Sequence, residues 1–190
     1  MEDFEIEIIV IYSDLVGSTK TVQELDPKQV RRYYRLFLNE MTNVIHDMGG
    51  SVLKFVGDCI IGFYVLPENS WISYVDRAIS CLCLMQKVME NSINPVAKNE
   101  GLPDMKSRIG IDSGKVQVLE VGVEGIYTTV DFFGDVMNIT SKICDMADPG
   151  EILLGENIWR LIYADFMARC HKKDNMMIKD IEYDIYSLKY

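Results

Sequence analysis

The chain has 190 residues, of which 48% are hydrophobic and 25% charged, so it can bury a substantial core and lacks the composition of a disordered segment. Lys and Arg number 19 against 29 Asp and Glu, and the resulting net charge of −10 excludes a general binder of the nucleic-acid backbone. No apolar run reaches the roughly 18 residues of a membrane span, so we expect no membrane partner and a cytoplasmic location. Five cysteines without a CxxC spacing, together with two histidines, favour neither a disulfide framework nor a zinc site.

The first half of the chain reads as a strand, a helix, a hairpin and a second helix. Residues 5–14, EIEIIVIYSD, form a nearly continuous β-branched run, which predicts a central strand. Asp26 and Pro27 are typical of a helix start, and apolar residues then recur at helical spacing as far as Met48. Two short apolar runs around Gly57-Asp58 predict a hairpin over residues 51–65, and a helical pattern follows over 70–91.

The second half is more broken. Residues 94–103 are polar and predict a loop, and the runs on either side of Ser113-Gly114 predict another hairpin. The remaining elements are predicted as a helix over 134–147, a strand over 152–154, a helix over 157–163 and strands over 166–170 and 184–188. No linker or internal repeat divides the chain, so we expect one domain over residues 1–190, an α+β fold with helices packed on one mixed sheet.

Two carboxylates are placed to meet at one end of that sheet. Asp14 ends the first strand, and Asp58 sits at the tip of the first hairpin. Two carboxylates in one spot repel each other unless a cation lies between them, and Mg²⁺ or Mn²⁺ is the cation that oxygen ligands favour. Either aspartate alone is also an ordinary turn residue. The small-residue turn over residues 15–19 could hold a phosphate on its N–H groups, although no Walker motif occurs and a plain turn is the simpler interpretation.

Four segments in order resemble the catalytic domain of the class III nucleotidyl cyclases. They are IYSDLVGST at residues 11–19, KFVGD at 54–58, DFFGDVMN at 131–138 and PGEIL at 149–153. The resemblance covers almost the whole chain and implies a ferredoxin-like mixed or antiparallel sheet. It also implies a reaction: the ribose 3′-hydroxyl of a nucleoside triphosphate attacks the α-phosphorus, giving a 3′,5′-cyclic monophosphate and pyrophosphate.

The same resemblance assigns roles around the phosphates. Asp14 and Asp58 would hold two metal ions, Mg²⁺ or Mn²⁺, which activate the attacking oxygen and stabilise the leaving phosphates. The N–H groups of Val16, Gly17 and Ser18 would cradle the β- and γ-phosphates.

Base recognition would fall to Lys54 and Asp131. A lysine can donate to N1 of adenine while an aspartate accepts from the 6-amino group, so the pair points to ATP and, on this argument, away from pyrimidines. Taken singly, Lys54 is also explained as an exposed lysine at a strand end, and Asp131 as a cap before a helix.

The last predicted site residues lie near the C-terminal side. Asn138 would orient the ribose, and Lys142 stands where the family has an arginine that stabilises the transition state. Lysine supplies a point charge in place of a planar fork, so the resemblance does not settle the turnover rate. Lys179 resembles the family's late phosphate-binding lysine, although Asp180 follows it where glycine is usual, and a solvated lysine is the alternative.

Active sites of this family form between two subunits, one supplying the metal aspartates and the other the base, ribose and transition-state groups. This chain carries both sets, which implies a homodimer with two equivalent sites. We therefore expect an adenylate cyclase. The alternatives are a stand-alone pyrimidine cyclase that makes cyclic CMP or UMP in antiviral signalling, and a catalytically weak regulatory module that binds nucleotide.

Overall fold

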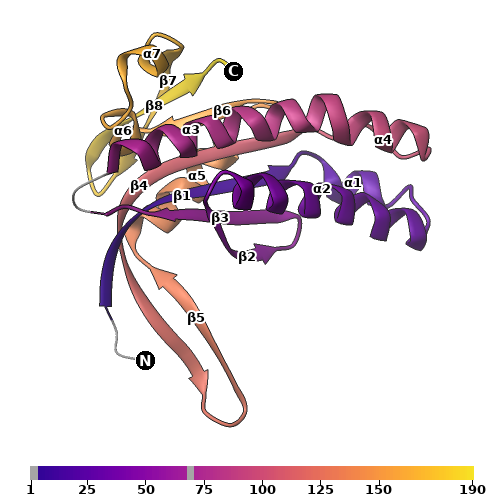
Figure 1. The fold of residues 1–190 in the computed structure, drawn as a ribbon, viewed down its shortest axis with the longest axis horizontal. Coiled ribbons are helices and arrows are strands. Elements are labelled where there is room, and N and C mark those ends of the chain that lie inside the picture. Colours follow the sequence, from indigo (N-terminus) through magenta and orange to yellow (C-terminus); the bar gives the residue numbers. More distant parts are fainter. Residues whose placement is uncertain (1–3, 68–70) are drawn as a thin grey trace.

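A computed structural model describes residues 4–67 and 71–190 of the chain. Within them, eight strands form one sheet in the order β2-β3-β1-β4-β6-β8-β7, with β5 paired to β4 (Figure 1). The strands are β1 (Phe4–Leu15), β2 (Ser51–Val56), β3 (Cys59–Val65), β4 (Ser107–Val123), β5 (Tyr127–Phe133), β6 (Ile152–Gly155), β7 (Cys170–Ile178) and β8 (Ile181–Leu188). Among these strands β4 and β6 pair in parallel and the other pairs are antiparallel, so the predicted mixed α+β sheet is confirmed.

The helices cover both faces of this sheet. They are α1 (Ser18–Val22), α2 (Pro27–Asp47), α3 (Trp71–Val88), the π-helical turn η1 (Met89–Ile93), α4 (Asn94–Asn99), α5 (Asp135–Met146), α6 (Glu156–Trp159) and α7 (Ala164–Met167). The predicted helix start at Asp26 is confirmed, because its carboxylate accepts the N–H groups of Lys28 and Gln29 while the Gln29 side chain accepts the Asp26 N–H. The helix predicted over 70–91 corresponds to α3 and η1. Its first predicted residue, Ser70, lies outside the described residues.

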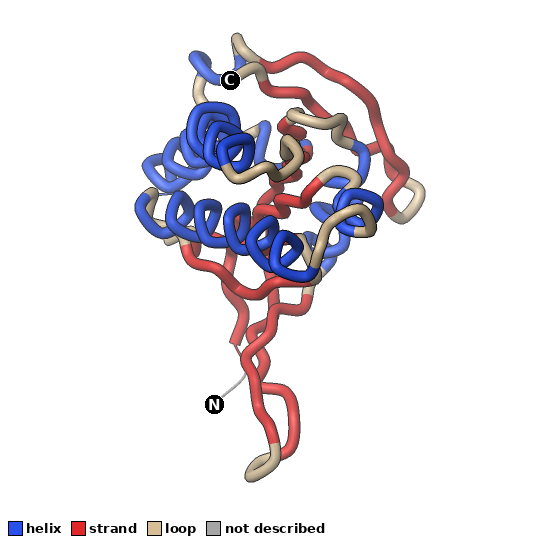
Figure 2. Tube along the Cα trace, turned by 90° about the vertical axis from the view of Figure 1, so that its right-hand side faces the viewer, coloured by secondary structure: helices blue, strands red, loops and turns tan. Residues whose placement is uncertain are grey.

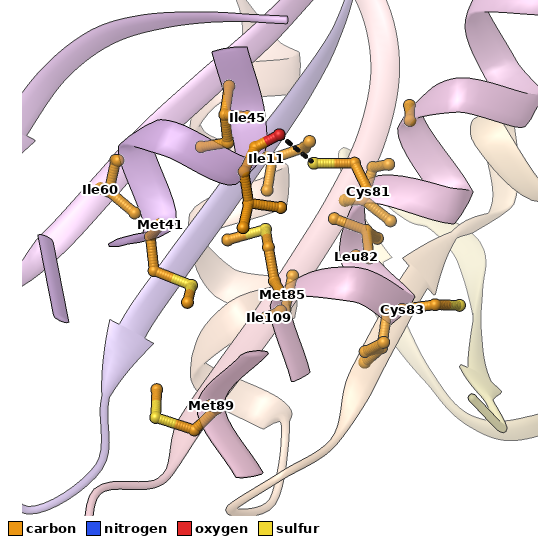
Figure 3. Close-up of a cluster of buried hydrophobic side chains, with 14 of the residues drawn as sticks. Ile11, Met41, Ile45, Ile60, Cys81, Leu82, Cys83, Met85, Met89 and Ile109 are labelled. Carbon is orange, nitrogen blue, oxygen red and sulfur yellow. Dashed lines mark hydrogen bonds between the residues drawn. The ribbon is translucent and has the colours of Figure 1, made fainter. Parts of the chain in front are cut away.

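Alternation along β1 divides the core between the two faces. Ile9 and Ile11 face α2 and α3, which lie side by side, and Figure 3 shows this part of the core with Met41, Ile45 and Met85. There the Cys81 thiol donates to the Val44 carbonyl at 4.0 Å, the dashed line of the figure. Ile8 and Val10 face the opposite way and pack against the start of α5. Because Asp14 has the same parity as Ile8 and Val10, its side chain lies on the α5 face.

The predicted turn at Ser113-Gly114 is wrong. β4 runs without interruption from Ser107 to Val123, and Ser113 and Gly114 sit opposite Ile9 and Ile8 of β1 in the ladder. Small residues in mid-strand indicated a turn, but continuous pairing with β1 from Ser107 to Val118 keeps the strand extended. The far half of β4 and β5 form a hairpin arm that projects from the body of the molecule (Figures 1 and 2).

Two other segments differ from the sequence prediction. The predicted loop over 94–103 begins with helix α4, because Pro95 lies in the first turn of that helix and the Asn94 side chain binds both backbone groups of Met105. The predicted strand over 166–170 is the end of α7 followed by a turn, and the edge strand β7 begins at Cys170 and runs to Ile178. Of the described helices, none has the length and apolar character needed to cross a membrane.

Candidate active site

The structure brings Asp14 and Asp58 to one end of the sheet. Antiparallel pairing places Ser13 of β1 opposite Ile60 of β3, so the end of β1 lies beside the β2–β3 turn that carries Asp58. The turn is sharp because Gly57 adopts φ 63°, a conformation that favours glycine. Burial raises the pKa of Asp14, the Arg108 hydrogen bond opposes that rise, and the charge of Asp58 adds to it.

This donor set fits a hard divalent cation. Two carboxylates with mutual repulsion, one of them largely buried, become more stable with a cation between them. Among the described residues, no group of three or more His, Cys, Asp or Glu side chains gathers at one point, so a cation at Asp14 and Asp58 would take its other ligands from backbone carbonyls, water or phosphate oxygens. Magnesium and manganese commonly complete their shells in this way.

Arg108 is a site residue that the sequence analysis missed. It stands directly opposite Asp14 in the β1–β4 ladder. Its Nε and Nη2 donate to the same oxygen of Asp14 at 3.0 and 2.9 Å, and its Nη2 lies 2.7 Å from Oδ1 of Asp145 on α5. The signal available in the sequence was a cation at the second position of a predicted strand, which becomes meaningful only when that strand is paired with β1.

Close packing of α5 against β4 makes this contact possible. Gly110 faces the middle of α5, and a Cβ atom there would lie 2.5 Å from the backbone N of Cys144 and 2.8 Å from the carbonyl oxygen of Thr140. Glycine therefore allows the backbones to approach closely enough for Asp145 to reach Arg108.

The small-residue turn after β1 forms only part of the predicted phosphate cradle. The Val16 N–H donates to the Lys106 carbonyl at 2.9 Å, so it is not free and the prediction for Val16 is wrong. In the part of the chain the structure describes, the N–H groups of Gly17 and Ser18 have no protein acceptor. Ser18 begins the short helix α1, which the sequence did not predict, and its hydroxyl donates to Asp58 at 2.5 Å.

Lys54 and Asp131 meet although their strands, β2 and β5, are not neighbours in the sheet. The Lys54 ammonium lies 2.5 Å from Oδ2 of Asp131, and the other Asp131 oxygen accepts the Phe132 N–H. The side chains are 43% and 22% exposed, so the pair is open to solvent and to a ligand. The two residues predicted to read the base are therefore side by side in one chain.

Asn138 and Lys142 lie on one exposed face of α5, one turn apart, and neither side chain is hydrogen-bonded within the described residues. Lys179 lies in the β7–β8 turn, where it and Asp180 both have positive φ, and its ammonium pairs with Asp135 in the first turn of α5. The turn thus brings Lys179 to the same end of α5 as Asn138.

A cavity of about 390 Å³ lies beside two of the candidate residues, Asp14 and Lys54. Asp14, Lys54 and Asp145 contribute polar lining, and Val56 and Ile61 contribute apolar lining. A larger cavity of about 570 Å³ lies beside the start of β1, where it is lined by residues such as Trp71 and contains none of the candidate site residues. Polar groups that converge in a partly apolar hollow are typical of a ligand site, and only the smaller of these two cavities has candidate residues in its lining.

Comparison with known proteins agrees with this geometry. The chain is 26% identical over 160 residues to a cytidylate cyclase of Escherichia coli, and 24% identical over 151 residues to a uridylate cyclase of Rhodovulum sp. (strain MB263). These alignments cover 80% and 76% of this chain, but the chain spans 34% and 60% of the length of those relatives.

The fold is shared with solved cyclase structures. The crystal structure of the adenylyl cyclase CyaB from P. aeruginosa matches with a TM-score of 0.90 and 25% identity, covering 100% of this chain and 97% of that one. The sequence model of the adenylate and guanylate cyclase catalytic domain matches residues 2–189. The chain therefore belongs to the family of adenylate and guanylate cyclase catalytic domains, the class III nucleotidyl cyclases.

Proposed function

We propose that the chain cyclises a nucleoside triphosphate to its 3′,5′-cyclic monophosphate and pyrophosphate. The observation that carries the proposal is the convergence of Asp14, Asp58 and Arg108 at one end of the sheet. The 3′-oxygen forms the new bond to the α-phosphorus, the bond from that phosphorus to the bridging oxygen of pyrophosphate breaks, and the hydroxyl proton is released.

Asp14 and Asp58 would hold two Mg²⁺ or Mn²⁺ ions. Such ions, when bound, lower the pKa of the attacking hydroxyl and neutralise charge on the phosphates. The Arg108 guanidinium binds the Asp14 carboxylate in this structure, as a metal cation would when bound. Its planar fork also suits phosphate oxygens. The N–H groups of Gly17 and Ser18, which have no acceptor among the described residues, lie next to Asp58 and provide further donors for the β- and γ-phosphates.

The groups on α5 complete the reaction from the opposite subunit of a homodimer. Asn138 would orient the ribose, and Lys142 would place a positive charge against the transition state. Lys179 would bind phosphate after separating from Asp135, which is an exposed partner. One chain carries both sets of groups, and this supports two equivalent sites formed by two copies.

The Lys54–Asp131 pair supports ATP as the substrate. Lys54 and Asp131 pair with each other in the absence of a base. A base that separates them must therefore offer an acceptor to Lys54 and a donor to Asp131. Adenine does so with N1 and its 6-amino group.

CTP is a second candidate, and the relatives named cytidylate cyclases favour it. Cytosine carries a 4-amino donor beside the N3 acceptor, so it presents the same pair of groups as adenine. The Lys54–Asp131 pair therefore disfavours uracil, which has no amino group, and does not disfavour cytosine.

The test is incubation of the purified protein with each of the four ribonucleoside triphosphates and Mg²⁺ or Mn²⁺, with products identified by chromatography. Cyclic AMP is the expected product, and cyclic CMP would identify the second candidate. Cyclic GMP or UMP would contradict the proposed recognition of the base by Lys54 and Asp131. An Asp58→Asn variant controls for contaminating activity. Nucleotide binding without any product would instead indicate the regulatory module.

A further inference from the structure

Residues 175–184, the tip of the β7–β8 hairpin, extend beyond the rest of the sheet. β8 pairs with β6 only from Ile185 to Leu188, because β6 ends at Gly155 opposite Ile185. Within the tip, β8 pairs with β7 alone among the described strands. The turn of the hairpin contains Lys179, to which the proposed function gives the role of binding phosphate. The position of this lysine therefore depends on the contacts that hold the tip.

The Tyr183 hydroxyl anchors the tip to the core of the molecule. It donates to Oδ2 of Asp112 at 2.5 Å and accepts the Asn157 N–H at 2.9 Å. Asp112 lies on the central strand β4 and is fully buried, and its other oxygen accepts the Ile158 N–H at 3.0 Å. The Tyr183 ring packs, together with Met176, against a buried cluster of α5, β6 and β8 residues. One phenol thus joins the hairpin tip to the middle of the sheet.

The fold makes room for this carboxylate. A Cβ atom at Gly155 would lie 2.5 Å from Cγ of Asp112, so only glycine leaves the space that the carboxylate occupies. Replacing a buried polar contact by apolar packing is often neutral or stabilising, so stability alone does not require an acid at this position. What the hydrogen bond adds is direction, because it fixes Tyr183 to one point of the core.

The other contacts of the tip are weaker or have to break. Lys179 pairs with Asp135, but the two side chains are 74% and 66% exposed, and the lysine must leave Asp135 before it can bind a phosphate. The Asp184 N–H donates to Glu156 at 3.3 Å, where the tip joins the sheet. Once Lys179 is released, the hydroxyl of Tyr183 is therefore the contact that still holds the tip against a buried group.

We propose that Tyr183 and Asp112 are positioning residues, which keep Lys179 directed at the substrate phosphates after it separates from Asp135. The inference rests on the proposed function, which supplies the phosphate. Both residues act through the hairpin and not on the substrate itself. Without the hydroxyl the tip samples other positions, so the lysine is in place in only a fraction of the molecules. The apparent dissociation constant then rises by the inverse of that fraction.

The experiment is a double-mutant cycle on Tyr183→Phe and Lys179→Met, with inorganic triphosphate and Mg²⁺ as the probe. This probe carries no base, so the result does not depend on which nucleotide the site prefers. We expect Tyr183→Phe to raise the dissociation constant measured by calorimetry about fivefold, and Lys179→Met to raise it about tenfold. In the Lys179→Met background, Tyr183→Phe should change it less than about twofold, because no ammonium group is left to position. Amide hydrogen exchange over residues 175–184 should be faster in Tyr183→Phe than in wild type.

Tyr64→Phe is the matched control. The Tyr64 hydroxyl donates to the Met48 carbonyl at 3.4 Å, and the residue is buried on the opposite face of the sheet. Its loss also removes a buried hydroxyl contact, so it should lower stability without changing the dissociation constant of triphosphate. Thermal unfolding followed by circular dichroism checks that every variant is folded.

An unchanged dissociation constant in Tyr183→Phe or in Lys179→Met overturns the inference and leaves the cyclase proposal standing. Equal losses from Tyr183→Phe in both backgrounds overturn it as well, because the hydroxyl then supports the fold and not the lysine. If wild type binds triphosphate but converts none of the four nucleotides, the proposed function fails while the cycle still decides the inference. If wild type does not bind triphosphate, the inference is overturned, and the product assay alone decides the proposed function.

Discussion

Arg108 and Asp14 face each other across β4 and β1, and two guanidinium nitrogens hold one oxygen of the carboxylate at 3.0 and 2.9 Å. The same guanidinium reaches Asp145 on α5. One cation therefore ties the predicted metal-binding carboxylate to the helix that carries Asn138 and Lys142. The side chains of Arg108 and Asp14 are 27% and 20% exposed, so water screens their interaction less than it screens a surface ion pair.

Replacing Arg108 should impair turnover more than folding. For Arg108→Ala we expect kcat/KM to fall about a hundredfold, because a preorganised cation is lost beside the phosphates. Arg108→Lys should recover only part of the loss, since it lacks the planar fork. Steady-state kinetics on the three proteins tests this. Arg32→Ala, which removes an exposed pair with Glu100, is the matched control and should change kcat/KM less than twofold. Wild-type kinetics in Arg108→Ala would contradict the assignment.

Loss of either carboxylate should abolish cyclisation. Asp14→Ala and Asp58→Ala are each expected to lower kcat by roughly a thousandfold or more, because several kcal/mol of charge stabilisation depend on the bound cations. Thermal unfolding followed by circular dichroism should show that both variants remain folded. Asp47→Ala changes an exposed carboxylate at the end of α2 and should retain activity. Full activity in either site variant would show that the metals bind elsewhere.

Metal binding should weaken on acidification sooner than it would at a free aspartate. Burial raises the pKa of Asp14, and a protonated carboxyl group is a poor ligand. Titration of the protein with Mn²⁺ by calorimetry across a pH series measures the effect. In Arg108→Ala the onset should move to higher pH, because the guanidinium that lowers the Asp14 pKa has been removed. Identical pH profiles in the two proteins would argue against Asp14 as a ligand.

Lys142 offers a variant that should improve the enzyme. For Lys142→Arg we expect kcat to rise about tenfold, because a bidentate fork matches phosphate oxygens better than an ammonium does. Lys142→Ala should lower kcat, with less effect on KM if the contact forms only in the transition state. Lys98→Arg, at the end of α4, is the control. If all Lys142 variants bind nucleotide and none forms product, the weak regulatory module is the better interpretation.

A second buried aspartate should tie stability to pH. Asp112 is fully buried, accepts the Tyr183 hydroxyl at 2.5 Å and the Ile158 N–H at 3.0 Å, and has its pKa raised by burial from 3.8 to about 6. A raised pKa in the folded state means that its stabilising contribution is complete below about pH 4 and declines as pH rises through 6.

The comparison is with Asp112→Asn, which cannot titrate. The difference in free energy of unfolding between wild type and this variant should shift against wild type by about 2 kcal/mol between pH 4 and pH 7. Urea denaturation at several pH values measures it, and a difference independent of pH would contradict the assignment.

Much of this fold could be predicted from local patterns, because apolar periodicity and capping residues act over a few positions. The strand ending at Asp14, the helix after Asp26 and the hairpin at Gly57 are confirmed in the structure. The continuity of β4 could not be predicted, because it depends on β1 pairing with Ser113 and Gly114 from a distant part of the chain.

The candidate site, like the fold, could be predicted only in part from the sequence. The motifs identified Asp14, Asp58, Lys54 and Asp131, but their meeting depends on the sheet order. Arg108 was missed because its partner lies far away in the sequence, and the Val16 N–H was misjudged because Lys106 takes it. The roles of the site residues, and the single domain over residues 1–190, stay predictions.

The packing of α5 against β4 near this site leaves no room for a side chain at Gly110. A single methyl group at that position would meet the backbone of α5 at 2.5 Å, and main-chain atoms cannot turn aside as a flexible side chain can. The helix would have to withdraw, and the Arg108–Asp145 link would separate although every charged group was still present. In a random mutagenesis screen, substitutions of Gly110 should therefore give inactive proteins as readily as substitutions of Asp14 or Asp58.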